Sequence, residues 1–281
     1  MKLKEIQSQF TKELTEIYPQ TEIRTFLNWL AEAYLSWNTT QVLLNSQQEL
    51  AEEKVQLFQA ALSELKKQKP IQYVLGETEF FGLPFKVNKS VLIPRPETEE
   101  LVDWILEDFK NAPKEIHVAE IGTGSGCISI SLAKYYSYFK VDAYDVSAEA
   151  LAVAQQNAKL NNAQVQFIEQ DVLTLEVLPN QVDLIVSNPP YVKKDESKSI
   201  KTNVLDYEPH LALFVENDSA FVFYKKIIEL ALAQEKVPTV YVEINQALGE
   251  ETKALFIHAG FKKVILKKDI FNNPRMIKAT Y

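Results

Sequence analysis

The sequence predicts an α/β protein: a doubly wound, mostly parallel sheet that ends in an antiparallel addition and is preceded by a small helical domain. Three observations support this prediction. The first 65 or so residues show only helical periodicity, strand-like and helix-like segments alternate from about residue 116 onward, and a glycine triplet follows the first of those strands. Such alternation is typical of sheets whose parallel strands are connected by helices.

Apolar residues recur every three or four positions through the first part of the chain, which is typical of amphipathic helices. These apolar residues form three stripes, and Ser46 and Glu49 have the spacing of a capping box ahead of the third one. The stripes are Ile6, Phe10, Leu14 and Ile17; Ile23, Phe26, Leu27, Leu30, Ala31, Tyr34 and Leu35; and Val55, Phe58, Leu62 and Leu65. We expect residues 1–69 to form a helical bundle with these side chains in its core.

From Pro70 the pattern changes. Residues 71–91 alternate apolar and polar around glycines and a proline, as a β-hairpin does, so residues 70–95 are expected to be a hairpin linker. Pro96 suits the first position of a helix, and the acids behind it suit the positive end of the helix dipole. The second domain is therefore expected to span residues 96–281.

Strands and helices alternate through this second domain. Helices are expected near residues 127–134, 147–160, 219–233 and 246–258. The expected strands are Ile116–Ile121, Lys140–Tyr144, Val165–Ile168, Val182–Ser187, Thr239–Ile244, Lys263–Lys267 and Met276–Ala279. Only a short link joins the last two strands, so they are expected to pair antiparallel. The most linker-like loop is Lys193–Asn203, which is rich in lysine and serine.

Composition excludes several classes of function. A formal net charge of -8 over 281 residues argues against a broad cationic surface for duplex DNA. The only cysteine, Cys127, rules out an internal disulfide and favours the cytoplasm. The three histidines are scattered without ligand spacing, so no metal site is expected. We expect no membrane span, because no apolar run approaches about 20 residues, and no signal peptide, because the first residues lack an apolar segment.

The stretch AEIGTGSG, residues 119–126, closes the first strand with a glycine-rich turn. Glycines let the backbone approach a ligand closely, and the following helix offers free N–H groups. The spacing is G-x-G-x-G, whereas a dinucleotide pyrophosphate favours G-x-G-x-x-G. A nucleoside without phosphates tolerates the former spacing, and Glu120, two residues ahead, would suit a cationic, amine-bearing cofactor.

Carboxylates also end the next two strands. Asp145 follows Gly124 by 21 positions and can accept hydrogen bonds from ribose hydroxyls. Asp171 can accept from an adenine amino group, with Val172 supplying backbone or apolar contact. Either acid alone could be a helix cap or lie in a solvated turn. Several such features at successive strand ends favour a ligand site, because ligands bind over the carboxyl ends of parallel strands.

This constellation resembles the S-adenosylmethionine-dependent methyltransferases of the Rossmann-like class. The resemblance implies a seven-stranded sheet and S-adenosyl-L-methionine as cofactor, released as S-adenosyl-L-homocysteine. Glu120 and the glycine loop would face the methionine part, Asp145 the ribose and Asp171 the adenine. The implied cofactor-binding residues are Glu120, Gly122, Thr123, Gly124, Gly126, Asp145, Val146, Asp171, Val172 and Asn188.

The stretch LIVSNPPY, residues 184–191, ends an apolar strand in an amide, two prolines and an aromatic ring. Proline donates no backbone hydrogen bond and keeps the preceding residue extended, so Asn188 and Pro189 present mainly acceptors. The Asn188 side-chain oxygen and the Pro189 carbonyl can accept both hydrogens of a planar NH2 group and orient its nitrogen for in-line attack. Tyr191 can pack on that planar group. The alternative is a proline turn that only stops the strand.

Motifs outside this core resemble one family. They are PIQYVLG (70–76), FFG (80–82), VLIPRPETE (91–99), GTGSGCI (122–128) and YEPHLAL (207–213). Together they resemble the protein-(glutamine-N5) methyltransferases that act on peptide-chain release factors, over essentially the whole chain. The resemblance implies methylation of the glutamine in the Gly-Gly-Gln motif of class I release factors, which tunes translation termination. Residues 1–69 would recognise the substrate, and a monomer without bound nucleic acid is expected.

The resemblance also implies individual roles. Asn188, Pro189 and Tyr191 would be catalytic. The implied substrate-binding residues are Asn188, Pro189, Pro190, Tyr191, Arg95, Glu97, Thr98 and Glu208. The chain departs from the family pattern at Asn245, where a glycine is usual; asparagine tolerates left-handed backbone conformations.

Two other functions remain open. Adenine-N6 methyltransferases of DNA or RNA share the NPPY stretch, but the acidic charge and the lack of an evident base-reading module argue against them. A non-catalytic binding module would keep the fold without the chemistry. The presence of Asp145, Asn188 and Tyr191 together argues against that reading.

Overall fold

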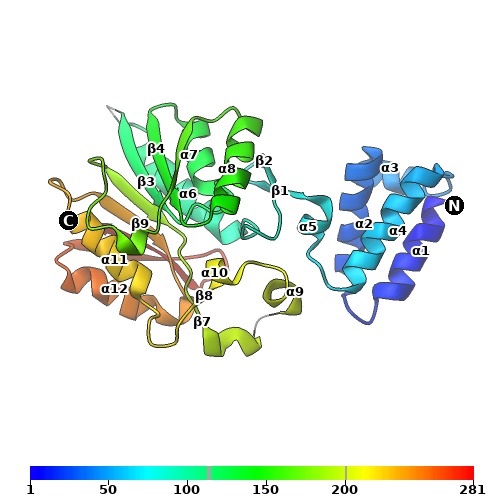
Figure 1. The fold of residues 1–281 in the computed structure, drawn as a ribbon. Helices are drawn as coiled ribbons and strands as arrows, with labels where there is room; N and C mark the ends of the chain where they lie inside the picture. Colours follow the sequence, from blue (N-terminus) through cyan, green and yellow to red (C-terminus); the bar gives the residue numbers. More distant parts are fainter. Residues whose placement is uncertain (113–114, 200) are drawn as a thin grey trace. The chain divides into compact units, whose positions relative to one another are not determined.

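The computed structural model describes residues 1–112, 115–199 and 201–281, which divide into two compact units (Figure 1). The helical unit comprises Met1–Gly76 together with Lys201–Tyr207. The sheet unit comprises the other described residues from Glu77 to Tyr281. The helical unit thus runs past the expected boundary at residue 69, and it includes a short segment that is distant in sequence.

Helices alone build the helical unit. They are α1 (Leu3–Leu14), α2 (Gln20–Leu35), α3 (Thr39–Leu44), α4 (Glu52–Lys66), α5 (Ile71–Leu75) and α9 (Thr202–Leu205). The predicted stripes form its core, with Phe10, Leu30 and Phe58 fully buried. Ile17 is the exception: it lies beyond the end of α1 and is exposed.

Two local predictions in this region are wrong. Ser46 and Glu49 do not cap α4, whose N-cap is Ala51; the capping box of this region is formed instead by Asn38 and Gln41 at the start of α3. Residues 71–75 form helix α5 rather than a strand, because the preceding proline has no N–H to leave unpaired at a helix start. Gly76 then ends the helix at φ +73°.

The hairpin follows immediately. Strands β1 (Glu77–Phe80) and β2 (Leu83–Lys86) pair antiparallel across a two-residue turn. Only this part of the predicted linker is a β-hairpin. Phe80 and Phe85, one from each strand, are buried in the core of the sheet unit.

A seven-stranded sheet forms the centre of the sheet unit, in the order β10-β11-β9-β6-β3-β4-β5. The strands are β3 (Ile116–Ile121), β4 (Phe139–Asp145), β5 (Val165–Glu169), β6 (Leu184–Ser187), β9 (Thr239–Glu243), β10 (Lys263–Lys268) and β11 (Pro274–Thr280). β11 pairs antiparallel with both β9 and β10, and the other pairings are parallel. The predicted fold class and strand set are confirmed.

Helices cover both faces of this sheet (Figure 1). Helices α6 (Pro96–Phe109), α7 (Cys127–Tyr135) and α8 (Ala148–Leu160) pack on one face, and α11 (Val222–Leu232) and α12 (Gly249–His258) on the other. Strand β6 shows why its sequence is continuously apolar. Leu184 and Val186 enter one core cluster, and Ile185 enters the other.

Short elements complete the sheet unit. They are η1 (Val172–Thr174), β7 (Val192–Lys193), η2 (Lys194–Ser199), α10 (His210–Leu213), β8 (Phe214–Val215) and η3 (Gln246–Leu248). Most of the predicted loop Lys193–Asn203 therefore has helical structure; Ile200 lies outside the described residues. No helix in the described part of the chain is both long and apolar enough to span a bilayer.

Candidate active site

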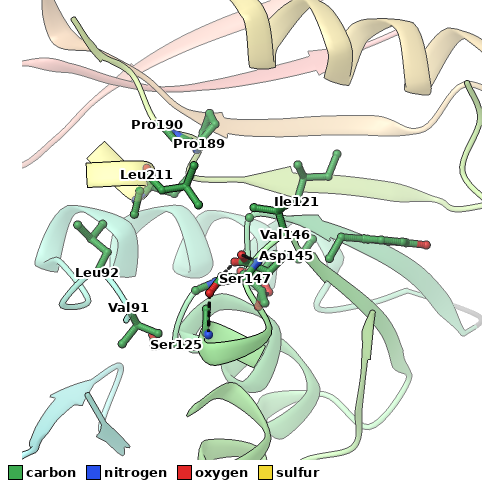
Figure 2. A pocket seen from close by; sticks show the side chains of 18 of the residues that line it. Val91, Leu92, Ile121, Ser125, Asp145, Val146, Ser147, Pro189, Pro190 and Leu211 are labelled. Carbon is green, nitrogen blue, oxygen red and sulfur yellow. Dashed lines mark hydrogen bonds between the residues drawn. The ribbon is translucent and has the colours of Figure 1, made fainter. Parts of the chain in front are cut away.

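The predicted cofactor and substrate residues meet where the strand order reverses. β3 has β4 on one side and β6 on the other, and all three strands run parallel. Their carboxyl ends, with that of β5, line a pocket of about 430 Å³. In Figure 2, Asp145, Val146 and Ser147 are grouped apart from Pro189, Pro190 and Leu211. The pocket therefore has two differently lined regions.

Most of the predicted residues line this pocket. They are Arg95, Thr98, Glu120, Gly122, Thr123, Gly124, Asp145, Val146, Asp171, Val172, Asn188, Pro189 and Pro190. Four predicted residues are absent from the lining: Glu97, Gly126, Tyr191 and Glu208. The lining also includes residues to which the sequence assigned no individual role, among them Leu92, Ser147, Leu211 and Phe223.

The glycine loop requires glycine for two different reasons. Gly122, Gly124 and Gly126 all have positive φ, between +53° and +80°, which disfavours side chains. An added Cβ at Gly122 or Gly124 would meet nothing within 4 Å, so these positions leave space for a ligand. A Cβ at Gly126 would lie 2.8 Å from Ile130 Cδ1. Gly126 is therefore needed for packing at the start of α7.

Glu120 is buried beneath the loop, with 1% of its surface exposed. Its Oε2 accepts hydrogen bonds from Thr123 Oγ1 at 2.6 Å and from the Ser129 backbone N–H at 3.2 Å. Burial raises the pKa of this carboxyl to about 7, although these two donors oppose the rise. Its charge therefore changes near neutral pH, and a cation bound beside it would favour the ionised form.

The two strand-end aspartates are held differently. Asp145 accepts from the Gly124 N–H at 2.8 Å and from the Ser147 N–H at 3.0 Å, so the carboxylate is fixed at the glycine loop. Asp171 is exposed and accepts from the Leu173 N–H at 2.9 Å, which makes it the cap of η1. The cap role and a place in the pocket lining thus coexist at Asp171.

The NPPY stretch leaves β6 directly into the pocket. Asn188 is half-buried and its side-chain nitrogen donates to Thr98 Oγ1 at 3.1 Å. Pro189 is buried and Pro190 half-buried, and both line the pocket. Tyr191 instead turns toward the core of the sheet unit, where its hydroxyl donates to Glu243 Oε1 at 3.1 Å. Burial raises the pKa of this hydroxyl above its usual range.

Arg95 and Glu208 form an ion pair at 2.6 Å. The Glu208 side chain is 1% exposed, and its second oxygen accepts from the Ile93 N–H at 3.1 Å. Glu208 therefore fixes the backbone before α6, while Arg95 lines the pocket. The partner of Arg95 thus comes from a segment 113 positions away along the chain.

Glu243 is a site residue that the sequence interpretation missed. It is 2% exposed at the end of β9, and its carboxylate accepts from both Thr98 and Tyr191. The signal was available, because the buried strand of sequence TVYVE contains a single acidic residue, at its end. Buried carboxylates are rare unless their oxygens are hydrogen-bonded.

Comparison with known proteins places this chain in a family. Residues 5–76 match the family model "PrmC N-terminal domain", and residues 101–211 match "Methyltransferase small domain". A curated release factor glutamine methyltransferase of Flavobacterium psychrophilum is 48% identical over 284 residues, covering 100% of both chains. The chain belongs to the release factor glutamine methyltransferase family. A second family member, from Bacteroides thetaiotaomicron, is 38% identical and covers 98% of both chains.

Solved structures support the fold of this family member. The hMettl16 catalytic domain matches with a TM-score of 0.56 and 16% identity, covering 82% of both chains. A methyltransferase from Pyrococcus furiosus matches with a TM-score of 0.50 and 21% identity, covering 71% of this chain and 89% of the other. At such identities the likeness concerns the methyltransferase fold alone.

Proposed function

We propose that this protein transfers a methyl group from S-adenosyl-L-methionine to the side-chain nitrogen N5 of the glutamine in the Gly-Gly-Gln motif of class I release factors. The observation that carries the proposal is the position of Asn188 and Pro189. They line one pocket together with Asp145 and the glycine loop. Full-length relatives named release factor glutamine methyltransferase support the choice of substrate.

The residues of the pocket fit this cofactor. Gly122 and Gly124 leave open space beside the loop, and Glu120 offers a buried carboxyl that suits an ammonium group. Asp145, held by the Gly124 N–H, would accept from ribose hydroxyls, and Asp171, held by the Leu173 N–H, would accept from an adenine amino group. When bound, the cofactor supplies a methyl group on a sulfonium, a carbon open to nucleophilic attack.

Asn188 and Pro189 would orient the glutamine amide. An amide nitrogen is a weak nucleophile because its lone pair is delocalised into the carbonyl. Accepting both N–H hydrogens, at the Asn188 Oδ1 and the Pro189 carbonyl, holds the group and directs the lone pair toward the methyl donor. No base is needed before transfer, since the product nitrogen loses its proton readily.

The helical unit would bind the remainder of the release factor. It has a hydrophobic core of its own, and a family model separate from that of the methyltransferase domain matches residues 5–76. We further propose that the protein acts as a monomer in the cytoplasm and binds no nucleic acid. The single cysteine supports the cytoplasm, and the net charge of -8 supports the absence of nucleic-acid binding.

Transfer of labelled methyl from S-adenosylmethionine to a purified class I release factor tests the proposal. We expect one labelled glutamine, and no label when that Gln of the Gly-Gly-Gln motif is replaced by Ala. Equal labelling of the altered release factor would reject the assignment. Single-stranded and duplex DNA serve as parallel substrates, and preferential labelling of their adenines would favour the adenine-N6 alternative.

A further inference from the structure

A chain of hydrogen bonds connects Asn188 to the interior of the sheet unit. The Asn188 side-chain nitrogen donates to Thr98 Oγ1 at 3.1 Å, and the Thr98 hydroxyl donates to Glu243 Oε2 at 2.6 Å. The other carboxylate oxygen of Glu243 accepts from the Tyr191 hydroxyl at 3.1 Å. The network therefore joins the start of α6, the end of β6 and the end of β9.

The hydrogen bonds of this network can point in only one direction. A threonine hydroxyl carries a single hydrogen, and Thr98 uses it in the short bond to Glu243. What Thr98 can offer to Asn188 is a lone pair, so it binds the NH2 side of the amide and not the oxygen. The Asn188 Oδ1 is consequently the end of the amide turned away from Thr98.

Glu243, at the end of this series of hydrogen bonds, is held in a fixed position. It belongs to β9, which lies between β6 and β11 in the sheet, and 2% of it is exposed. The Tyr224 hydroxyl donates to its backbone carbonyl at 3.1 Å. Both side-chain oxygens accept hydrogen bonds, the pattern of an ionised carboxylate. Burial raises the pKa of Glu243, and the Thr98 hydroxyl, Arg275 and Tyr191 oppose that rise.

A neighbouring contact fixes Tyr191 itself. Asn245 has a negative φ of -63°, not the left-handed conformation its sequence position suggested. Its side-chain nitrogen donates to the Tyr191 carbonyl at 3.2 Å, and its oxygen accepts from the Ala247 N–H at 2.9 Å. The Tyr191 hydroxyl is thus bonded to the last residue of β9, and its carbonyl to the segment that follows β9.

We propose that Thr98, Glu243 and Tyr191 are positioning residues that lock the Asn188 amide with its oxygen toward the substrate. This inference rests on the proposed function. Without the lock the amide can turn over, and its NH2 group would then face the NH2 group of the glutamine, where two donors oppose each other. Thr98 and Tyr191 would act through Asn188 rather than by the direct substrate contact that the family resemblance implies.

The first test compares Thr98→Val with Thr98→Ser. Valine keeps the shape but has no hydroxyl, so we expect kcat for release-factor methylation to fall about tenfold, the value of one net hydrogen bond. Serine restores the hydroxyl and should restore most of kcat. The dissociation constant for S-adenosylmethionine, measured by calorimetry, should stay within about twofold in both. Wild-type kcat in Thr98→Val would overturn the inference.

A double-mutant cycle shows whether Thr98 acts through Asn188. In an Asn188→Ala background there is no amide to orient, so adding Thr98→Val should leave the residual rate unchanged. If Thr98→Val instead lowers kcat in the Asn188→Ala background by the same factor as in the wild type, Thr98 has a separate role and the inference is overturned. If Thr98→Val does not fold, Tyr191→Phe takes its place in the same cycle, because it keeps the ring and removes one donor to Glu243.

Thr252→Val is the matched control for Thr98→Val. Thr252 is also fully buried, but its hydroxyl donates to the Leu248 carbonyl at 2.7 Å, in a helix away from the pocket lining. We expect the two variants to lose similar amounts of Tm, but only Thr98→Val to lose kcat. This result would show that the loss of kcat comes from the orientation of Asn188 and not from general destabilisation. An inactive wild-type protein would contradict the proposed function, whereas an active wild type with an equally active Thr98→Val contradicts only the positioning role.

Discussion

Asn188 combines two roles that are separable by measurement. We propose that its oxygen binds the substrate amide, and its nitrogen is bonded to Thr98. For Asn188→Ala we expect kcat to fall by about 10²–10³-fold, the usual effect of removing one oriented polar group at a reacting centre. Affinity for S-adenosylmethionine should change by less than about threefold. A large loss of cofactor affinity in calorimetry would instead assign the residue to cofactor binding.

Glu120 gives a second prediction for a single residue. Burial raises the pKa of this carboxyl to about 7, above the value near 4.5 of an exposed glutamate, so it is protonated below pH 7 in the free protein. In the proposed site, cofactor binding would pair a cation with the ionised form. Affinity should therefore fall as pH drops below 7, by up to about tenfold per pH unit.

Calorimetric dissociation constants at pH 5.5, 6.5 and 7.5 measure this dependence. The Glu120→Gln variant provides the control, because glutamine does not titrate. The affinity of this variant for the cofactor should be weaker than that of the wild type and independent of pH. The same raised pKa also makes Glu120 oppose folding as pH rises from about 4.5 to 7, since the unfolded carboxyl ionises first. A pH-independent affinity in the wild type would contradict pairing between Glu120 and the cofactor cation.

Among the elements, α7 depends on the close approach of its first turn to α8. Gly126→Ala would place a Cβ 2.8 Å from Ile130 Cδ1 and 3.2 Å from Ala154 Cβ, at a backbone φ of +80°. We expect the free energy of unfolding to fall by about 2–4 kcal/mol from strain and overpacking together. Chemical denaturation of the variant and the wild type measures the difference.

Gly82→Ala is the matched control for this substitution. Its φ is +71°, similar to that of Gly126, but the nearest atom to an added Cβ lies 3.9 Å away. It should show the strain of positive φ without the clash, about 1 kcal/mol. Equal destabilisation by the two substitutions would mean that packing against α8 does not contribute.

The segment before α6 depends on one buried carboxylate. Glu208→Ala removes the partner of Arg95 and the acceptor of the Ile93 N–H. We expect a loss of about 2–3 kcal/mol in unfolding free energy, because a backbone donor is left unsatisfied. KM for the release factor should also rise, since Arg95 lines the pocket.

Glu77→Ala is the comparison for Glu208→Ala. Glu77 pairs with Lys86 at 2.6 Å, but both side chains are about half exposed, so the pair is screened by water. Denaturation midpoints should scarcely change. A loss as large as that of Glu208→Ala would mean that burial does not explain the importance of Glu208.

For the molecule as a whole, chain order and spatial order agree only in part. Apolar segments that alternate with helical ones predicted the positions of all seven strands within a few residues. They did so because every strand is covered on one or both faces by helices. Segment Lys201–Tyr207 shows the limit. It belongs with the first 76 residues, and the Tyr207 hydroxyl donates to the Lys67 carbonyl at 2.8 Å. No periodicity in seven residues indicates such a partner.

The same limit applies within the site. The place of Asp145 and Asn188 was predictable because Asp145 ends one strand and Asn188 directly follows another, and parallel strands end at one edge of the sheet. The direction of Tyr191 was not, because its hydroxyl bonds to a carboxylate 52 positions away. The short helix Ile71–Leu75 was misjudged because five residues cannot display a helical period.

The sequence by itself determined the seven strands of the sheet and the longer helices, which glycines and acids lie at the strand ends, and to which family the motifs belong. These features depend on neighbours along the chain and on the side from which each segment is buried. Only the tertiary structure decided that Thr98 meets Glu243 across 145 positions and that Arg95 meets Glu208 across 113. Such pairs are chosen by proximity in the folded core, where a buried polar group must find a partner whatever its distance along the chain.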